Sequence, residues 1–371
     1  MKPANGYEIV QLFEQFAPKK YALEGDKIGL QVGRLNKPVE KVLVTLDVTE
    51  AVVDEAVEKE VQLIIAHHPP IYRPLQKIDM ETAAGRILEK LIKHDIAVYA
   101  AHTNLDVARG GVNDLLAEAL GLTNTEVLVP TYEEPLKKLV VFVPEENAKE
   151  VKQAIGDAGA GAIGEYTHCA FSAPGIGQFL PGEGTNPYIG QQGKLEEVRE
   201  IRVETIVPES IEKKVISAML KAHPYEEVAY DLYPLENKNE PLGLGRIGEV
   251  PKMSLKEFAE HVKKALDIPA VRVVGDLNAE ISKVALLGGD GNKYFMSAKF
   301  KGADVYVTGD IYYHTAHDAL MVGLNMIDPG HYAEKVMKKG VVRVMSGLCR
   351  EKNLAVSFLE SEVDTNPFQF V

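Results

Sequence analysis

The chain has 371 residues, of which 46% are hydrophobic and 26% are charged, and its formal net charge is -13. This length predicts two or three folding units, and no apolar run reaches the roughly 20 residues that a membrane span needs. The acidic balance argues against a nucleic-acid partner. The N-terminal segment lacks the residue order of a signal peptide, so we expect a cytoplasmic protein.

The first part of the chain alternates strand and helix patterns, which is typical of an α/β domain with buried, mostly parallel strands. Short apolar runs predict three strands, over 41–48, 61–68 and 96–104. Amphipathic stretches predict three helices, over 49–60, 82–95 and 110–121.

The pattern changes near Pro130. Between residues 136 and 235 the expected order is β-α-β-β-α-β, the plan of a ferredoxin-like α+β fold. A stretch over 175–193, rich in Gly, Pro, Asn and Gln, predicts a long loop between the two central strands.

After Pro241 the α/β alternation resumes and continues through strands near 282–289, 303–310 and 324–330. We therefore predict a discontinuous α/β domain with an inserted ferredoxin-like domain. The expected bounds are 1–130 plus 241–371 for the first domain and 131–240 for the insertion.

Residues of the metal-ligand type follow the early strands at their C-terminal ends, where open α/β sheets usually place their sites. His67 and His68 end one buried strand and precede two prolines. Because neighbouring strand residues point to opposite faces, both reach one site only if the chain turns there. The next strand ends in His102 and delivers Asp106 four residues later.

A further pair of ligand-type residues lies late in the chain. His331 and Glu334 stand three apart at the start of a predicted helix, which places both side chains on one face. With His67, His68 and Asp106 they supply three imidazoles and two carboxylates. This set suits zinc, iron or manganese and is too rich in nitrogen for calcium or magnesium.

Five ligands are many for one tetrahedral ion. If Asp106 or Glu334 bridges, the set could hold two divalent ions, with zinc favoured, and leave open positions for water. Such ions lower the pKa of bound water from about 15.7 toward 7. The hypothesis is therefore hydrolysis by metal-bound hydroxide.

Each motif also has a simpler explanation. A lone histidine at a strand end is more often a hydrogen-bonded structural residue. An isolated His-x-x-Glu pair usually lies on a solvated helix face, where its Glu favours the helix dipole. The three motifs together favour the metal centre.

The three motifs, in this order and around an insertion, resemble the family of GTP cyclohydrolase I type 2 homologues, also called NGG-interacting-factor-like proteins. The resemblance covers essentially the whole chain and implies a dinuclear metal centre in a toroidal homohexamer. It also implies an insertion similar to the PII signalling and copper-tolerance proteins, and residues 131–240 fit that description. Some members double the late histidine, whereas only His331 follows Gly330 here. The implied ligands are His67, His68, Asp106, His331 and Glu334.

Three further residues are candidate catalytic groups. His102 could orient a ligand or accept a proton, or could simply cap a helix. Asp310 and His314 follow another strand and would share one helical face, so we expect both in the pocket near the metals. Asp310 could instead cap that helix, and we expect His317 at the surface.

Several other motifs favour structural roles. Gly288, Gly289 and Gly291 follow a strand but lack the Lys-Ser/Thr ending of a phosphate-binding loop, so a tight turn is expected. His223 and Glu226 suit a helix end entering a strand rather than a second metal site. The two cysteines, Cys169 and Cys349, lie far apart and are expected to be packing residues.

Two functions remain open from the sequence. The first is a metal-dependent hydrolase acting on a nucleotide-like small molecule, to which the resemblance adds GTP cyclohydrolase activity. The second is a non-catalytic metal-binding regulator or scaffold whose inserted domain senses a ligand or partner. Open metal positions facing a pocket favour the hydrolase, and closed coordination favours the scaffold.

Overall fold

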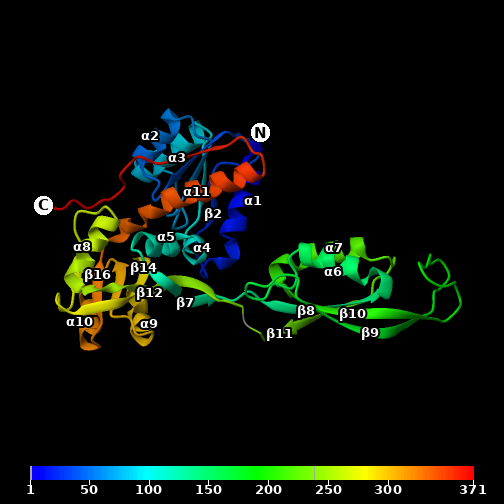
Figure 1. Cartoon of the computed structure of the whole chain (residues 1–371). Coiled ribbons are helices and arrows are strands. Elements are labelled where there is room, and N and C mark those ends of the chain that lie inside the picture. The colour runs from blue at the N-terminus through cyan, green and yellow to red at the C-terminus, as the bar shows by residue number, and fades with distance from the viewer. Residues whose placement is uncertain (1, 238) are drawn as a thin grey trace. The chain divides into compact units, whose positions relative to one another are not determined.

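The computed structural model describes residues 2–237 and 239–371. The chain divides into two compact units (Figure 1). The discontinuous unit comprises Met1–Tyr132 and Leu242–Val371, and the inserted unit comprises Glu133–Pro241. Within the described ranges, no helix has the length and apolar character that crossing a bilayer requires.

The discontinuous unit contains a five-stranded sheet with the order β17-β4-β5-β6-β2, in which β2 alone is antiparallel to its neighbour. Every residue of β5 and β6 is buried, as expected for strands covered on both faces. The strands are β2 (Gly29–Val32), β4 (Lys41–Thr45), β5 (Leu63–Ala66), β6 (Ala97–Ala100) and β17 (Ser357–Glu360).

A second sheet in the same unit has the order β13-β16-β15-β14-β12-β7, with β14, β15 and β16 parallel. The sequence pattern did not indicate β7 and β12, which pair with each other where the chain leaves for the inserted unit and returns. The strands are β7 (Thr123–Tyr132), β12 (Leu242–Ser254), β13 (Arg272–Val274), β14 (Glu280–Asp290), β15 (Val305–Gly309) and β16 (Asn325–Asp328).

Helices cover both sheets and fill the space between them. One apolar cluster joins side chains of both sheets to α1, α5, α8 and α11, and separate clusters pack α2 and α3 on the first sheet and α9 and α10 on the second. The mixed α/β class is therefore confirmed. The helices are α1 (Gly6–Phe16), α2 (Glu50–Glu58), α3 (Ala83–Lys93), α5 (Val112–Ala119), α8 (Leu255–Ala265), α9 (Phe295–Phe300), α10 (Tyr313–Met321) and α11 (Val336–Glu351).

Capping residues explain where several of these helices begin. The side chains of Thr49, Thr82 and Ser254 each accept a hydrogen bond from a backbone amide in the first turn of α2, α3 and α8. Ser254 and Glu257 form a complete capping box, which satisfies two amides that the helix itself leaves unpaired. The remaining short elements are β1 (Ala4–Asn5), η1 (Lys19–Tyr21), β3 (Pro38–Val39), α4 (Thr103–Val107), η4 (Asn292–Tyr294) and η5 (His331–Lys335).

The inserted unit is a four-stranded antiparallel sheet with the order β11-β8-β10-β9. Helices α6 and α7 pack on one of its faces (Figure 1). Its elements follow one another as β8 (Leu136–Pro144), η2 (Glu145–Asn147), α6 (Ala148–Asp157), β9 (Ala170–Phe179), β10 (Glu196–Pro208), η3 (Glu209–Ile211), α7 (Glu212–Ala222) and β11 (Tyr230–Leu235).

Strand β9 extends further than the sequence indicated. The loop predicted over 175–193 begins only after Phe179, because β9 pairs with β10 in continuous register from Ala170 to Phe179. Pairing with a long neighbouring strand outweighs the low strand preference of glycine and proline in this segment.

Asn113 links helix α4 to strand β14 of the second sheet. Its buried amide donates to the carbonyl oxygen of Asp106 at 3.0 Å and accepts from the amide of Gly288 at 3.0 Å. We expect Asn113→Ala to lower the free energy of unfolding by about 2 kcal/mol, because it leaves the buried carbonyl of Asp106 and the partly buried amide of Gly288 unpaired. Urea denaturation followed by circular dichroism measures this, with the exposed Asn278→Ala as control. Equal losses in the two variants would contradict the prediction.

Candidate metal centre

His67 and His68 lie where the chain leaves β5. The strand ends at Ala66, and the backbone then turns so that the two imidazole ring centroids lie 5.0 Å apart. The amides of His67 and His68 still donate to the carbonyl oxygens of Thr45 and Leu46, at 3.1 and 2.9 Å. The neighbouring strand therefore holds the turn that brings both rings to one side.

Asp106 reaches the same place from the end of β6. That strand ends at Ala100, and the short helix α4 carries Asp106 in its last turn. Its Oδ1 lies 3.5 Å from Nε2 of His67. His102 precedes α4 without making a side-chain capping bond, and its ring centroid lies 5.3 Å from that of His67.

His331 and Glu334 come from η5, which follows β16. In a 3-10 helix residues three apart are eclipsed, so both side chains point the same way, with His331 Nε2 and Glu334 Oε2 3.3 Å apart. Gly288 and Gly289 lie against this carboxylate, and a Cβ at either would come within 2.9 Å of Glu334 Oε1. The glycine motif thus makes room for Glu334.

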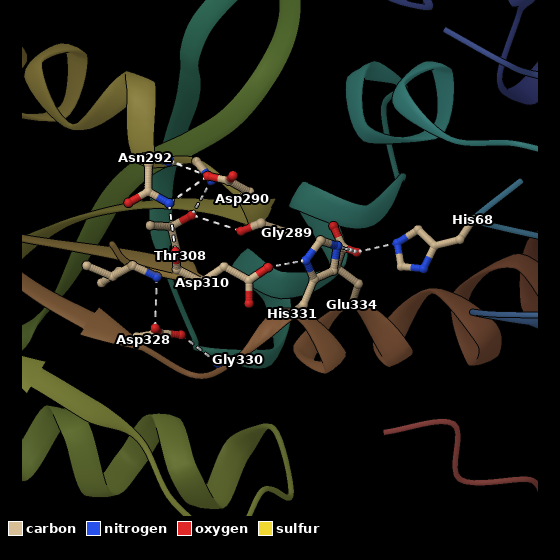
Figure 2. A network of polar contacts seen from close by, with 12 residues as sticks. His68, Gly289, Asp290, Asn292, Thr308, Asp310, Asp328, Gly330, His331 and Glu334 are labelled. Carbon is tan, nitrogen blue, oxygen red and sulfur yellow. Dashed lines mark hydrogen bonds and ion pairs between the residues drawn. The ribbon is translucent and has the colours of Figure 1, made fainter. Parts of the chain in front are cut away.

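The carboxylate of Glu334 is the point on which the imidazoles converge. Its Oε2 lies 3.2 Å from Nε2 of His68 and 3.7 Å from Nε2 of His67. Figure 2 shows His331 and His68 on either side of it. Ligand atoms about 2.0–2.1 Å from a tetrahedral zinc ion lie roughly 3.3 Å apart, so this spacing fits ligands that share an ion.

Each imidazole is oriented by an oxygen atom that contacts its Nδ1. Nδ1 of all four rings faces an oxygen atom, at distances between 2.6 and 2.8 Å. A carbonyl oxygen can only accept, so Nδ1 of His67 carries a hydrogen, and Nε2 is the nitrogen that faces the cluster. The oxygen atoms belong to Ala101 for His67, Asp47 for His68, Asp26 for His102 and Asp310 for His331.

Two atoms of the cluster face each other at 3.5 Å without forming a hydrogen bond. His67 Nε2 and Asp106 Oδ1 are buried, and neither has a hydrogen-bond partner among the described residues. Leaving such a group unpaired costs about 1–3 kcal/mol. A cation that accepts both lone pairs would remove this penalty, so the residues present fit a bound metal ion.

The pKa values of the histidines and carboxylates in the cluster are shifted by burial and by their charged neighbours. Burial opposes the charged form of His68, but Asp47 and Glu334 raise its pKa to about 10. The hydrogen bond to Glu334 raises the pKa of His331 to about 9. Burial raises the pKa of Asp106 to about 6, whereas the imidazoles hold the pKa of Glu334 well below its usual range despite burial. The carboxylates thus stabilise positive charge on the neighbouring imidazoles.

Three groups of side chains in this cluster could each hold an ion, with ligand atoms within 4.8 Å of one another. Two of the groups share Glu334. A cavity of about 960 Å³ opens over them, and Asp310, Lys293 and Tyr312 are among the residues that line it. The groups are His67, Asp106 and Glu334; His68, His331 and Glu334; and His67, His68 and His102.

The structure corrects the expectation for His314. Asp310 adopts a φ of 55°, and α10 begins only at Tyr313, so Asp310 and His314 do not share a helical face. His314 is exposed and does not line the cavity, whereas Asp310 lines it and accepts from His331. His317 is exposed, as predicted.

Two carboxylates of the cluster were missed in the sequence. Asp47 follows β4 by two residues, so the strand-end rule that located the histidines could have found it. Asp26 lies in a loop outside regular structure and left no comparable signal.

The candidate residues of the inserted unit make their contacts within that unit. His223 Nε2 lies 2.9 Å from the carbonyl oxygen of Phe142, and Glu226 accepts from the amide of Asn186. Neither joins a metal-ligand group among the described residues. Cys349 is buried, and Cys169 is partly exposed.

Comparison with known proteins agrees with the residue patterns. The family model described as Duf34/NIF3 (NGG1p interacting factor 3) matches residues 4–367. The protein named GTP cyclohydrolase 1 type 2 homolog from Bacillus subtilis is 63% identical over 371 residues, which is 100% of both chains. The crystal structure of a Bacillus cereus protein related to NIF3 is 61% identical, with a TM-score of 0.96 over 100% of both chains. A Staphylococcus aureus structure is 32% identical, with a TM-score of 0.78 and the same coverage. This chain therefore belongs to the Duf34/NIF3 family.

Proposed function

We propose that this protein binds two divalent metal ions, with zinc favoured and iron or manganese as alternatives, and hydrolyses a nucleotide-like small molecule. The observation that carries the proposal is the sharing of Glu334 by two ligand groups beneath a cavity of about 960 Å³. Its volume is at the upper end of the usual range for small-molecule sites, roughly 300–1,000 Å³.

The ligand groups suggest how the ions would be held. His67 and Asp106 would hold one ion, His68 and His331 the other, and Glu334 would bridge them. Each ion would then have only three protein ligands, which leaves positions open for water or substrate. When bound, two such ions would lower the pKa of water toward neutrality, which is the chemistry that hydrolysis needs.

His102 is suited to move a proton beside the metal ligands. It lines the cavity, and its Nδ1 lies 2.8 Å from Asp26 Oδ1. Burial would raise the pKa of Asp26, but hydrogen bonds from His102 and Thr103 hold that pKa well below its usual range. Asp26 therefore stays ionised and orients the imidazole, leaving Nε2 of His102 for proton transfer.

The substrate class rests on the relatives. The Bacillus subtilis relative is named a GTP cyclohydrolase 1 type 2 homolog, which makes GTP the first substrate to test. We also propose, on the family resemblance, a cytoplasmic homohexamer and a ferredoxin-like inserted unit. The element order of the inserted unit supports the last point.

A second candidate function is a metal-binding regulator whose inserted unit senses a ligand. The observation in its favour is a cavity of about 570 Å³ lined by residues of the inserted unit alone. Turnover by the metal-loaded protein separates the two functions.

We expect the purified protein to hold about two divalent ions per chain and Glu334→Gln to lose both, because Glu334 belongs to both ligand groups. His68→Ala should lose one ion. Inductively coupled plasma mass spectrometry gives the metal content, and the exposed His314→Ala is the matched control. Unchanged metal in both Glu334→Gln and His68→Ala would exclude the proposed site.

Asp47→Asn should weaken metal binding about 10–100-fold, because the charged acceptor that orients His68 is replaced by a weaker, neutral one. Competition with a chelator measures the affinity. Asp54→Asn is the control, since Asp54 is 58% exposed and pairs only with Lys90 among the described residues. Equal affinity in Asp47→Asn and the unaltered protein would show that Asp47 does not position a ligand.

His102→Gln should retain both ions but lower turnover about 10²–10⁴-fold, because the proton carrier is removed. Chromatography of a nucleotide panel that includes GTP measures turnover, and metal content is determined on the same samples. Loss of an ion would instead identify His102 as a ligand. Absence of turnover by the metal-loaded unaltered protein across the panel would favour the regulator.

A further inference from the structure

The inserted unit carries a cavity of its own. The sheet packs its Leu139, Val141 and Val203 side chains against α6 and α7. The alternating residues that point to the opposite face of the sheet, among them Phe142 and Glu200, line a cavity of about 570 Å³. The loop over 180–195 adds further lining residues, so the cavity lies between this loop and the sheet.

Aromatic rings form much of the cavity wall. Tyr225 lies at the centre of the group, with ring centroids 5.8 Å from Phe179 and 6.4 Å from Tyr188. Phe142 lines the same cavity. Tyr188 comes from the loop and is 53% exposed, so its ring is available to stack on a flat ligand.

A buried carboxylate lies among these rings. Glu200 is 8% exposed, and its Oε1 accepts from the hydroxyl of Tyr225 at 3.0 Å. Burial and Glu200 both raise the pKa of Tyr225, which keeps its hydroxyl protonated as a donor. This hydrogen bond uses Oε1, and Oε2 is not one of the fully buried, unpaired atoms of the described residues, so this second oxygen stays open to the cavity.

Glycine keeps the space beside this carboxylate open. A Cβ on Gly177 would lie 2.1 Å from Glu200 Oε2, so no other residue fits there without displacing the carboxylate. Gly175 stands directly opposite Glu200 in the ladder and adds no side chain to the cavity floor. Glu200 Oε2 therefore lies beside two strand positions that carry no side chain.

We propose that the inserted unit binds a planar heteroaromatic molecule that stacks on Tyr188 and donates an N–H hydrogen bond to Glu200. The ring walls supply stacking surface, and the carboxylate supplies an acceptor whose second oxygen is unused. Three of the charged lining residues are acidic, Glu200, Glu226 and Glu227, against the single cation Arg202. This balance selects donors such as a ring amino group over a phosphate.

The test compares 9-methyladenine, which carries an amino donor, with 9-methylpurine, which has the same ring shape without a donor. Isothermal titration of the full-length protein should show binding of 9-methyladenine and at least tenfold weaker binding of 9-methylpurine. Glu200→Gln and Tyr188→Ala should each weaken 9-methyladenine binding about tenfold, through loss of a charged acceptor and of a stacking surface.

Two controls locate the site. Tyr166→Ala removes an exposed tyrosine of the same unit that does not line the cavity, and binding should be unchanged. Glu334→Gln disrupts the metal cluster and should also leave binding unchanged, which separates this proposal from the proposed hydrolase. Equal affinity for the two probes, no binding at several millimolar probe, or binding unaffected by both Glu200→Gln and Tyr188→Ala would overturn the proposal.

Discussion

The carboxylate of Glu334 is the constraint on which the site depends. It is 2% exposed, and a buried charge is tolerated only where neighbouring groups compensate it. Nε2 atoms of three imidazoles surround it, each held from behind through Nδ1. Gly288 and Gly289 leave it room, and the tight turn of η5 sets His331 beside it. These local features are all explained by the need to place one buried charge among imidazoles.

Sequence reasoning located Glu334 and the four residues that gather around it, although their metal binding stays a prediction. The reason is topological, because the C-terminal ends of parallel strands lie along one edge, so ligand-type residues at successive strand ends approach one another. His67 and Asp106 follow β5 and β6 in this way. The late pair needed only the spacing of a helical turn, which a 3-10 helix meets as well as an α-helix.

The sequence predictions failed where the backbone departs from regular geometry, or where a residue's role depends on a partner that is distant in the sequence. His314 was misplaced because Asp310 adopts a left-handed conformation that delays the start of the helix, and an aspartate alone does not predict that conformation. Asp26 acts through a partner that is 76 residues away in sequence. Strands β7 and β12 pair across the whole inserted unit, so no local pattern joins them.

The pairing of β7 with β12 also has a consequence for how the chain could acquire or lose a domain. Tyr132 and Leu242 are partners in the ladder, so the polypeptide departs and returns at neighbouring positions. For the discontinuous unit, 109 intervening residues from Glu133 to Pro241 amount to one long hairpin connection. The entropy of closing such a connection grows only slowly with its length. Replacing that segment by a short turn would preserve the ladder, so the inserted unit is a module that evolution or engineering could exchange while the cluster of histidines and carboxylates keeps its geometry.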